Sequence, residues 1–329
     1  MDHWERLDTA IAGRRTDRIP LSLWRHFPED DLDPAKLAAH MVAWQRKWDF
    51  DLVKFMPSGT YGVEDWGAKT AFEGAANGAR AVVTPGLLRA DGWPKLARLD
   101  PRRGELGKQV EALRLAAREL GGRAPVLQTV FSPLTTARKL AGERVFADLR
   151  RAPELLDAGL RIITDVTIDF AAASLEAGAH GMFFATQCAS YRVLAAAEYE
   201  RFGRRWDLEF FAALRGRTRL NLLHIHGEDV MFGLLADYPV EALNWHDRLT
   251  APALAEGFAQ SRALLVGGVE ETRTLASGPL EAIRTQVADA IRQTGGRRLM
   301  VGPGCVVPIA TPEAHLRAVV DAVRAAPVD

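Results

Sequence analysis

Cysteine is scarce in this chain: Cys188 and Cys305 are the only two among its 329 residues. Two cysteines cannot build a disulfide framework, so the composition favours a reducing compartment. No apolar run reaches the ~18 residues of a membrane span. The charged N-terminal segment also lacks the apolar core of a signal peptide. We therefore expect a cytoplasmic protein without a membrane-spanning segment.

An excess of charge of either sign is also absent. Lys and Arg together number 42, Asp and Glu together number 42, and the formal net charge is zero. No basic stripe with interleaved aromatic residues is present, which argues against nucleic acid as a partner. The chain likewise lacks a P-loop, a Ser-His-Asp pattern and paired carboxylates. We therefore expect a small-molecule substrate.

What the chain does contain is an alternation of short apolar segments and longer amphipathic ones. The apolar segments are ~5–8 residues long and apolar on both faces, as strands covered by helices are. Eight strands separated by helices predict an α/β fold, namely a single-domain (β/α)8 TIM-type barrel over residues 1–329. An open doubly wound sheet is the alternative, but no Gly-rich phosphate loop follows the first strand. The expected strands are 19–24, 50–56, 124–131, 180–185, 219–226, 241–246, 262–269 and 297–302.

Residues 57–103 interrupt this alternation after the second expected strand. The segment is rich in Gly, Pro and Trp and carries no long amphipathic pattern. We interpret it as a long insertion on the active face of the barrel, with room for a small hairpin.

The barrel fold sorts the polar residues, because chemistry in such barrels takes place at the carboxyl ends of the strands. Polar or thiol side chains follow most of the expected strands. They are Arg25, His26, Glu64, Gln187, Cys188, His224, His226, His246, Asp247, Glu270 and Cys305.

Three of these residues form a candidate metal site. His224 and His226 are two apart on one strand and therefore share a face. Cys305 follows the last strand, in a loop that can fold over the mouth of the barrel. Two imidazoles and a thiolate suit Zn²⁺ and leave a fourth position open, as catalytic zinc sites do. Alternatively, the histidines only make hydrogen bonds in a polar mouth, and Cys305 is a small apolar residue.

The remaining candidates have less specific signals. His246, Asp247 and Glu270 are candidate catalytic groups, and either carboxylate can orient a histidine or be an ordinary polar residue at a strand end. Cys188 is expected to be a packed thiol rather than a fourth ligand.

Several segments, taken in order, resemble the uroporphyrinogen decarboxylase superfamily. They are "RLDTAIAGRRTDRIPLSLW", "FSPLTTARKLAG", "GAHGMFFATQCAS", "LNLLHIHGE" and "GPGCVVPIATPEAHLRAVVDAVR". The resemblance implies a barrel that is a single domain, and it also implies a homodimer.

The true decarboxylases of this superfamily are matched poorly at their substrate-binding positions. The N-terminal loop "LWRHFPEDD" keeps Arg25 but lacks the second arginine of those enzymes. Lys54, Phe55 and Met56 offer no counterpart to their central aspartate, and their late histidine falls near Pro303. These departures argue against a porphyrinogen substrate.

The corrinoid-dependent methyltransferases of the superfamily are matched better. They hold zinc with a His-x-Cys pair after strand five and a later cysteine. His224 and Cys305 match the first and last ligands, and His226 replaces the middle cysteine. The resemblance implies a zinc-dependent methyltransferase that moves a methyl group between a corrinoid on a separate protein, or a small methylated compound, and a thiol-type acceptor.

Within this hypothesis Glu270 or Asp247 orients the ligands or fills the fourth position. The expected substrate-binding residues are Arg25, His26, Glu64 and Gln187. A metal-free lyase that decarboxylates a porphyrinogen or a smaller acid is the first alternative. A barrel that only carries a corrinoid or pterin is the second.

Overall fold

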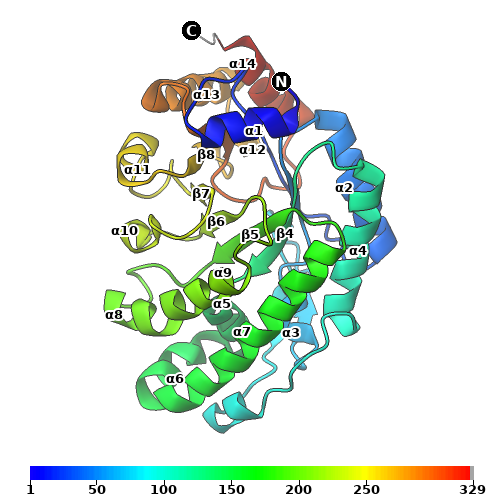
Figure 1. Cartoon of the computed structure of the whole chain (residues 1–329), viewed down its shortest axis with the longest axis vertical. Helices are drawn as coiled ribbons and strands as arrows, with labels where there is room; N and C mark the ends of the chain where they lie inside the picture. Colours follow the sequence, from blue (N-terminus) through cyan, green and yellow to red (C-terminus); the bar gives the residue numbers. More distant parts are fainter. Residues whose placement is uncertain (327–329) are drawn as a thin grey trace.

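The structure is a computed structural model that describes residues 1–326, and a parallel sheet lies at its centre (Figure 1). Seven strands form this sheet in the order β1-β4-β5-β6-β7-β8-β9, and every neighbouring pair is parallel. Seven of the eight expected strands are therefore confirmed, with bounds that differ by a few residues. They are β1 (Val53–Phe55), β4 (Val126–Phe131), β5 (Gly181–Thr186), β6 (Leu222–Ile225), β7 (Ala242–Trp245), β8 (Leu264–Val269) and β9 (Leu299–Pro303).

The expected first strand, 19–24, is an extended segment that forms a single parallel bridge, between Leu21 and Val301 of β9. Two features prevent a longer ladder. Pro20 has no N–H to donate, and the N–H of Leu21 donates to the carboxylate of Asp51 (2.8 Å) instead of to a strand. The prediction of eight regular strands is therefore wrong for this segment. It nevertheless lies between the two edge strands of the sheet. It contacts β9 through the bridge to Val301, and on its other side the Leu21 carbonyl accepts from Asp51 N (2.9 Å), just before β1.

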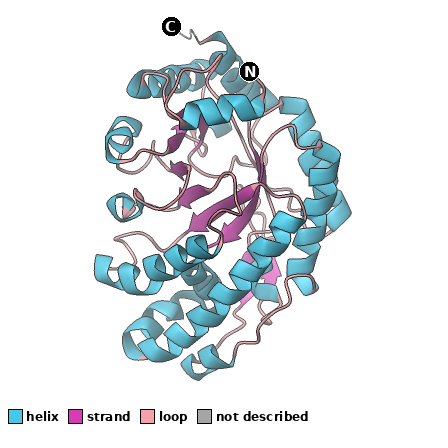
Figure 2. Ribbon diagram, in the orientation of Figure 1, coloured by secondary structure: helices cyan, strands magenta, loops and turns pink. Residues whose placement is uncertain are grey.

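Helices surround the curled sheet (Figure 2). Local signals begin several of them: the Asp33 carboxylate accepts from the first-turn N–H groups of α2, and Pro153 begins α7. The helices of seven or more residues are α1 (His3–Ile11), α2 (Pro34–Trp48), α4 (Gly104–Leu120), α5 (Pro133–Ala141), α6 (Val145–Arg151), α7 (Pro153–Glu176), α9 (Arg205–Ala213), α11 (Leu254–Gln260), α13 (Leu280–Thr294) and α14 (Glu313–Ala325). Shorter helical turns are α8 (Ala196–Tyr199), α10 (Phe232–Leu235), α12 (Thr274–Ser277), η2 (Gly142–Arg144) and the π-helical η3 (Glu200–Arg204).

Residues 57–103 contain the hairpin for which the sequence left room. Strands β2 (Lys69–Ala71) and β3 (Ala81–Thr84) pair antiparallel, between the short helix α3 (Tyr61–Glu64) and the 3₁₀ turn η1 (Ala90–Lys95). The loop between the two strands touches the segment that follows Cys305, since Ile309 N donates to Ala76 O (2.8 Å). The hairpin loop is thus tied to the rim of the sheet where the candidate residues lie.

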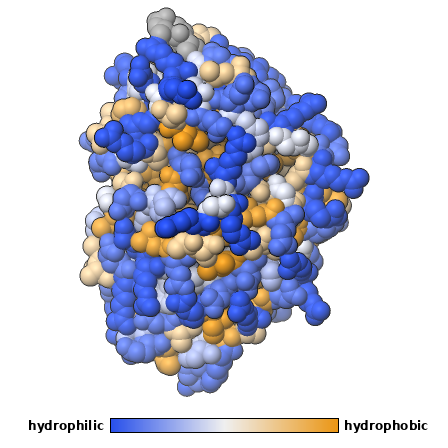
Figure 3. All heavy atoms as spheres, in the orientation of Figure 1, coloured by the Kyte–Doolittle hydropathy of each residue, from blue (hydrophilic) through white to orange (hydrophobic). Residues whose placement is uncertain are grey.

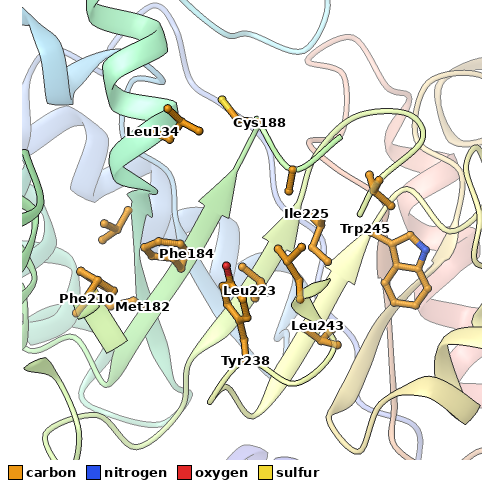
Figure 4. Close-up of a cluster of buried hydrophobic side chains, with 14 of the residues drawn as sticks. Leu134, Met182, Phe184, Cys188, Phe210, Leu223, Ile225, Tyr238, Leu243 and Trp245 are labelled. Atoms are coloured by element: carbon orange, nitrogen blue, oxygen red, sulfur yellow. The ribbon is translucent and has the colours of Figure 1, made fainter. Parts of the chain in front are cut away.

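Alternate residues of the strands form two apolar layers. Phe184, Leu223, Ile225 and Leu243 belong to the layer between the sheet and the helices (Figure 4). The intervening residues, such as Phe183 and Leu222, form a separate cluster inside the curled sheet. Cys188 is fully buried in the outer layer, where burial raises the pKa of its thiol to about 12. The expectation that Cys188 is a packed thiol is confirmed.

The face of the molecule in Figure 3 is mostly hydrophilic, with apolar residues gathered near its centre. None of the helices within residues 1–326 combines the length and the apolar character needed to cross a bilayer.

Candidate metal centre

Four side chains meet where β6, β7 and β9 end. Leu223 and Ile225 of β6 point into the outer layer (Figure 4), so His224 and His226 face the inside of the curled sheet. His246 follows β7, and Cys305 follows β9. One ligand atom from each of His224, His226, His246 and Cys305 lies within 4.8 Å of the other three.

Three of the six spacings among these atoms match those of a tetrahedral zinc site. Cys305 Sγ lies 3.6 Å from His224 Nε2 and 3.6 Å from His226 Nδ1, and His246 Nε2 lies 3.2 Å from His226 Nδ1. Bond lengths of about 2.0–2.1 Å to nitrogen and about 2.3 Å to sulfur place the donors of a tetrahedron roughly 3.3–3.6 Å apart. Three imidazoles and a thiolate are also ligand types that zinc accepts.

Asn244 fixes the orientation of His224. Its amide oxygen accepts from His224 Nδ1 (2.6 Å), while its amide nitrogen donates to Val266 O (2.8 Å) and Pro303 O (3.0 Å). The two donations leave only the oxygen to face the imidazole, so Nδ1 carries the proton and Nε2 presents a lone pair to Cys305. Such outer partners set the tautomer of metal-binding histidines in proteins.

Glu271 plays the same role for His246 and also holds the cysteine loop. One carboxylate oxygen lies 3.0 Å from His246 Nδ1, and the other accepts from Gly304 N (3.1 Å). A Cβ on Gly304 would come within 2.9 Å of His246 Cα. Glycine at 304 therefore lets the loop that carries Cys305 approach the end of β7 closely enough to complete the cluster.

The charge state of the cluster also suits a cation. Burial alone would raise the pKa of Cys305, but His224, His226 and His246 hold it well below its usual value. Burial lowers the pKa of His224 to about 4, so this imidazole is neutral. Burial opposes protonation of His246 as well, but hydrogen bonds to Cys305 and Glu271 raise its pKa to about 10. The cluster thus pairs the Cys305 thiolate with the proton of His246, and a metal cation can replace that proton.

A model of the family described as "Uroporphyrinogen decarboxylase (URO-D)" matches residues 3–326. The chain belongs to the uroporphyrinogen decarboxylase family.

Relatives of this family member include proteins described as methyltransferases. Methylcobamide:CoM methyltransferase MtaA of Methanosarcina barkeri is 26% identical over 332 residues, which are 96% of each chain. Methylcobamide:CoM methyltransferase MtbA of Methanosarcina acetivorans is 20% identical over 334 residues, or 97% of each chain. A solved structure of a methyltransferase from Methanosarcina mazei matches with a TM-score of 0.86 and 22% identity, covering 98% of both chains. This last likeness shows the fold.

Glu270 and Asp247 lie outside the cluster of this family member. The Glu270 carboxylate accepts from the N–H groups of Arg273 (3.0 Å) and Thr274 (2.7 Å) at the start of α12. The Asp247 carboxylate accepts from Gly268 N (3.1 Å), and burial raises its pKa to about 6. Backbone amides occupy both carboxylates, so these contacts give no support to the prediction that one of them orients a ligand.

Two of the expected substrate-binding residues are also held by other contacts. Arg25 donates to Ile309 O (3.1 Å), in the segment after Cys305, and stacks over Phe27 with its guanidinium 5.2 Å from the ring centroid. Glu64 accepts from Thr60 (2.9 Å) and, in the hairpin, from Thr70 (3.0 Å). Neither side chain belongs to the cluster of three histidines and Cys305.

His26 and Gln187 differ in their relation to the cluster. Burial and then the charge of Lys54 lower the pKa of His26 to about 3, whereas the charge of Cys305 raises it. His26 is therefore neutral and lies within range of both charges. Gln187 directly follows β5, where its N–H donates to Thr135 Oγ1 (2.8 Å). A role in substrate binding remains a prediction for Arg25, His26, Glu64 and Gln187.

The sequence contained a signal for the fourth ligand that we did not use. His224 pairs with Asn244 in the register of β6 and β7, so His226 and His246 continue as neighbours two residues later. "His-Ile-His" and "Asn-Trp-His" thus form one matched pattern on adjacent strands. The sequence predicts a catalytic role for His246, whereas in the structure its ligand atom is the fourth member of the cluster. Asn244 and Glu271 were also missed.

Proposed function

We propose that this chain is a zinc-dependent methyltransferase that transfers a methyl group to a thiol-type acceptor from a corrinoid on a separate protein, or from a small methylated compound. His224, His226, His246 and Cys305 would hold the zinc ion. The observation that carries the proposal is the spacing of these four donor atoms. The relatives described as methylcobamide:CoM methyltransferases, which the chain matches along nearly its whole length, support methyl transfer as the reaction.

Zinc, when bound, supplies a Lewis acid that lowers the pKa of an acceptor thiol. The residues of the chain prepare the site for that thiol. Asn244 holds His224 Nε2 toward the cluster, and Glu271 holds both His246 and the loop of Cys305. An acceptor thiol would take the position of His246 at the zinc. His246 Nε2 would then hold the proton that the thiol releases, since Glu271 stabilises the protonated imidazole.

The transfer itself is a displacement at carbon. A bond forms between the acceptor sulfur and the methyl carbon, the bond from that carbon to its donor breaks, and the electron pair stays on the donor. The chain needs no acidic group at the reacting carbon for this step. That agrees with the occupied carboxylates of Glu270 and Asp247.

A decarboxylase without metal has less support. That reaction needs acidic and basic groups that converge on the substrate, and we expected Arg25, His26 and Glu64 to provide them. The Arg25 guanidinium and the Glu64 carboxylate are held by Ile309, Thr60 and Thr70 instead. The homodimer remains a prediction.

Metal content and thiol methylation test the proposal. Purified protein is expected to hold about one zinc ion per chain, and Cys305→Ala to lose it, while Cys188→Ala, at the packed thiol, keeps it. The zinc-loaded protein should methylate an added thiol in the presence of methylcobalamin, and Cys305→Ala should not. Protein that binds no zinc, or that holds zinc but methylates no thiol from any donor tried, contradicts the proposal.

A further inference from the structure

Arginine gathers at the amino ends of the strands, opposite the candidate metal centre. Exposed arginines precede the extended segment 19–24 and the strands β4, β6, β8 and β9. Because parallel strands around a curled sheet begin on the same face, these side chains belong to one surface. We call this surface the arginine edge, and it consists of Arg14, Arg15, Arg123, Arg215, Arg217, Arg262 and Arg297.

Helix α1 lies across this surface and joins its parts. It contacts the segments that precede β4, β6 and β9. The contacts are a hydrogen bond from Trp4 Nε1 to Gly122 O (3.0 Å), an ion pair of Asp8 with Arg219 (2.7 Å), and the approach of Gly13 to Arg298, whose Cγ would lie 3.6 Å from an added Cβ. The arginines before these strands therefore surround one short helix.

The side chains of the arginine edge have no partner within residues 1–326. All of them are exposed, and none forms an ion pair or a side-chain hydrogen bond in that part of the chain. The nearby acids Asp8 and Asp17 are already paired with Arg219 and Arg6. Arginines on the outer helices differ, since glutamates pair with Arg102, Arg114 and Arg150. Like charges gathered on one surface repel each other, so the arginine edge calls for an anion from outside the chain.

The dipoles of the neighbouring helices do not account for this surface. The carboxyl end of a helix favours cations, but the effect is confined to the last turn. Arg123 and Arg297 come after the left-handed caps Gly121 and Gly295, which end α4 and α13. The chain as a whole has no net charge, so the arginine edge is a local excess of positive charge. Such an excess attracts a negatively charged partner and speeds its association.

We propose that the arginine edge binds an acidic segment of a partner protein. The planar guanidinium fork can donate two parallel hydrogen bonds to one carboxylate, which a lysine cannot do. Two cavities of about 510 Å³ and about 680 Å³ also open on this side of the sheet, and Arg123 lines the first and Arg215 the second. Acidic side chains can enter them beside these arginines. A partner bound here leaves the opposite end of the sheet open.

Nucleic acid and a lipid bilayer fit this surface less well. Proteins that bind single-stranded nucleic acid stack bases on aromatic side chains, and helices that bind bilayers insert apolar ones. None of the exposed large apolar side chains in the described part of the chain lies in the segments that carry the arginine edge. The nearby Trp4 ring is covered by Arg219, whose guanidinium lies 3.8 Å from the ring centroid.

A fluorescein-labelled decaglutamate peptide tests the inference, and fluorescence anisotropy measures its dissociation constant. Wild type should bind this peptide, and the affinity should fall as salt screens the charges. Labelled decaglutamine should not bind. In Arg215→Gln/Arg217→Gln the affinity should fall about tenfold, as expected for the loss of two exposed charge pairs. Wild type that does not bind decaglutamate overturns the inference.

Arg151→Gln/Arg205→Gln is the matched control. Arg151 and Arg205 are likewise exposed and form no ion pair within residues 1–326, but they lie at the end of α6 and the start of α9. This variant loses the same charge away from the arginine edge and should bind decaglutamate as wild type does. Equal losses of affinity in the two double variants would show that net charge alone attracts the peptide, and would overturn the inference.

Two further comparisons separate the kind of partner and the proposed function. Labelled decathymidylate and vesicles that contain phosphatidylserine should bind more weakly than decaglutamate. Tighter binding of either one, lost in Arg215→Gln/Arg217→Gln, overturns an acidic protein as the partner. Cys305→Ala should bind decaglutamate like wild type, because Cys305 lies at the carboxyl ends of the strands. The inference therefore does not depend on zinc or on methyl transfer, and a loss of peptide binding in Cys305→Ala overturns the placement of the binding surface.

Discussion

At the scale of single residues, Asn244 decides which nitrogen of His224 faces the cluster. Replacing it by leucine removes the acceptor of the Nδ1 proton and frees the ring to rotate or change tautomer. We expect Asn244→Leu to weaken zinc binding about tenfold to a hundredfold, the usual cost of losing such a partner. Competition with a chelator of known affinity measures this. Asn221→Leu is the matched control, because Asn221 lies just before β6, where it accepts from Met182 N of β5 and donates to Thr218. Equal zinc affinities in the two variants would contradict the role of Asn244.

The neighbouring carboxylates Glu270 and Glu271 make a second prediction. Glu271→Gln weakens the hydrogen bond to His246 and should reduce zinc affinity by about tenfold. Glu270→Gln should leave zinc affinity unchanged and lower the free energy of unfolding by about 1 kcal/mol, because it removes the charge that accepts from the Arg273 and Thr274 N–H groups. Chelator competition and urea unfolding on both variants measure the two effects. The assignment fails if the effects are reversed.

These residues show what a single sequence can resolve. The meeting of His224, His226 and Cys305 could be predicted, since residues two apart share a face and parallel strands end on one rim. The sequence could not show which of Glu270 and Glu271 contacts a histidine. Both follow β8, and the turn into α12 alone decides that Glu270 takes up backbone amides while Glu271 points to His246.

At the scale of elements, the loop after β9 depends on the close packing of Gly304. In Gly304→Ala the new Cβ would press on the backbone of His246, so the loop must shift and carry Cys305 with it. We expect a folded protein whose zinc affinity is reduced by about tenfold, comparable to the loss of a partner residue. Gly59→Ala is a suitable control, because a Cβ there meets nothing within 4 Å. Circular dichroism verifies the fold, and unchanged zinc affinity in Gly304→Ala would show that the loop can accommodate the methyl group.

The elements themselves were largely readable from the sequence. Apolar runs bounded by amphipathic segments identified the seven strands of the main sheet, because buried parallel strands are apolar on both faces. The segment 19–24 has the same apolar character but forms no longer ladder. Pro20 lacks an N–H group, and the N–H of Leu21 donates to the Asp51 carboxylate. That hydrogen bond depends on a residue thirty positions away, so no local sequence pattern predicts it.

At the scale of the whole molecule, the proposed centre joins residues from three strands that are far apart in the chain, so it exists only while the sheet is intact. The stability of the fold therefore limits the conditions under which the site can work.

One buried acid makes that stability depend on pH. Asp207 of α9 accepts from Tyr199 (2.8 Å), the last residue of α8, and from Tyr238 (3.0 Å), which lies between α10 and β7.

Burial raises the pKa of Asp207 from 3.8 to about 7, so the folded protein keeps a proton that the unfolded chain releases. This proton stabilises the folded protein fully below about pH 4. The stabilisation falls as the pH rises toward 7, by at most about 1.4 kcal/mol per pH unit, and no more is lost above that pH. Asp207→Asn keeps a neutral side chain at every pH. We therefore expect the free energy of unfolding of wild type, relative to this variant, to fall between about pH 5 and pH 8. Urea unfolding of both proteins at the two pH values measures the difference, in which every other titrating group is shared. A difference that does not change with pH would mean that Asp207 is already ionised in the folded protein.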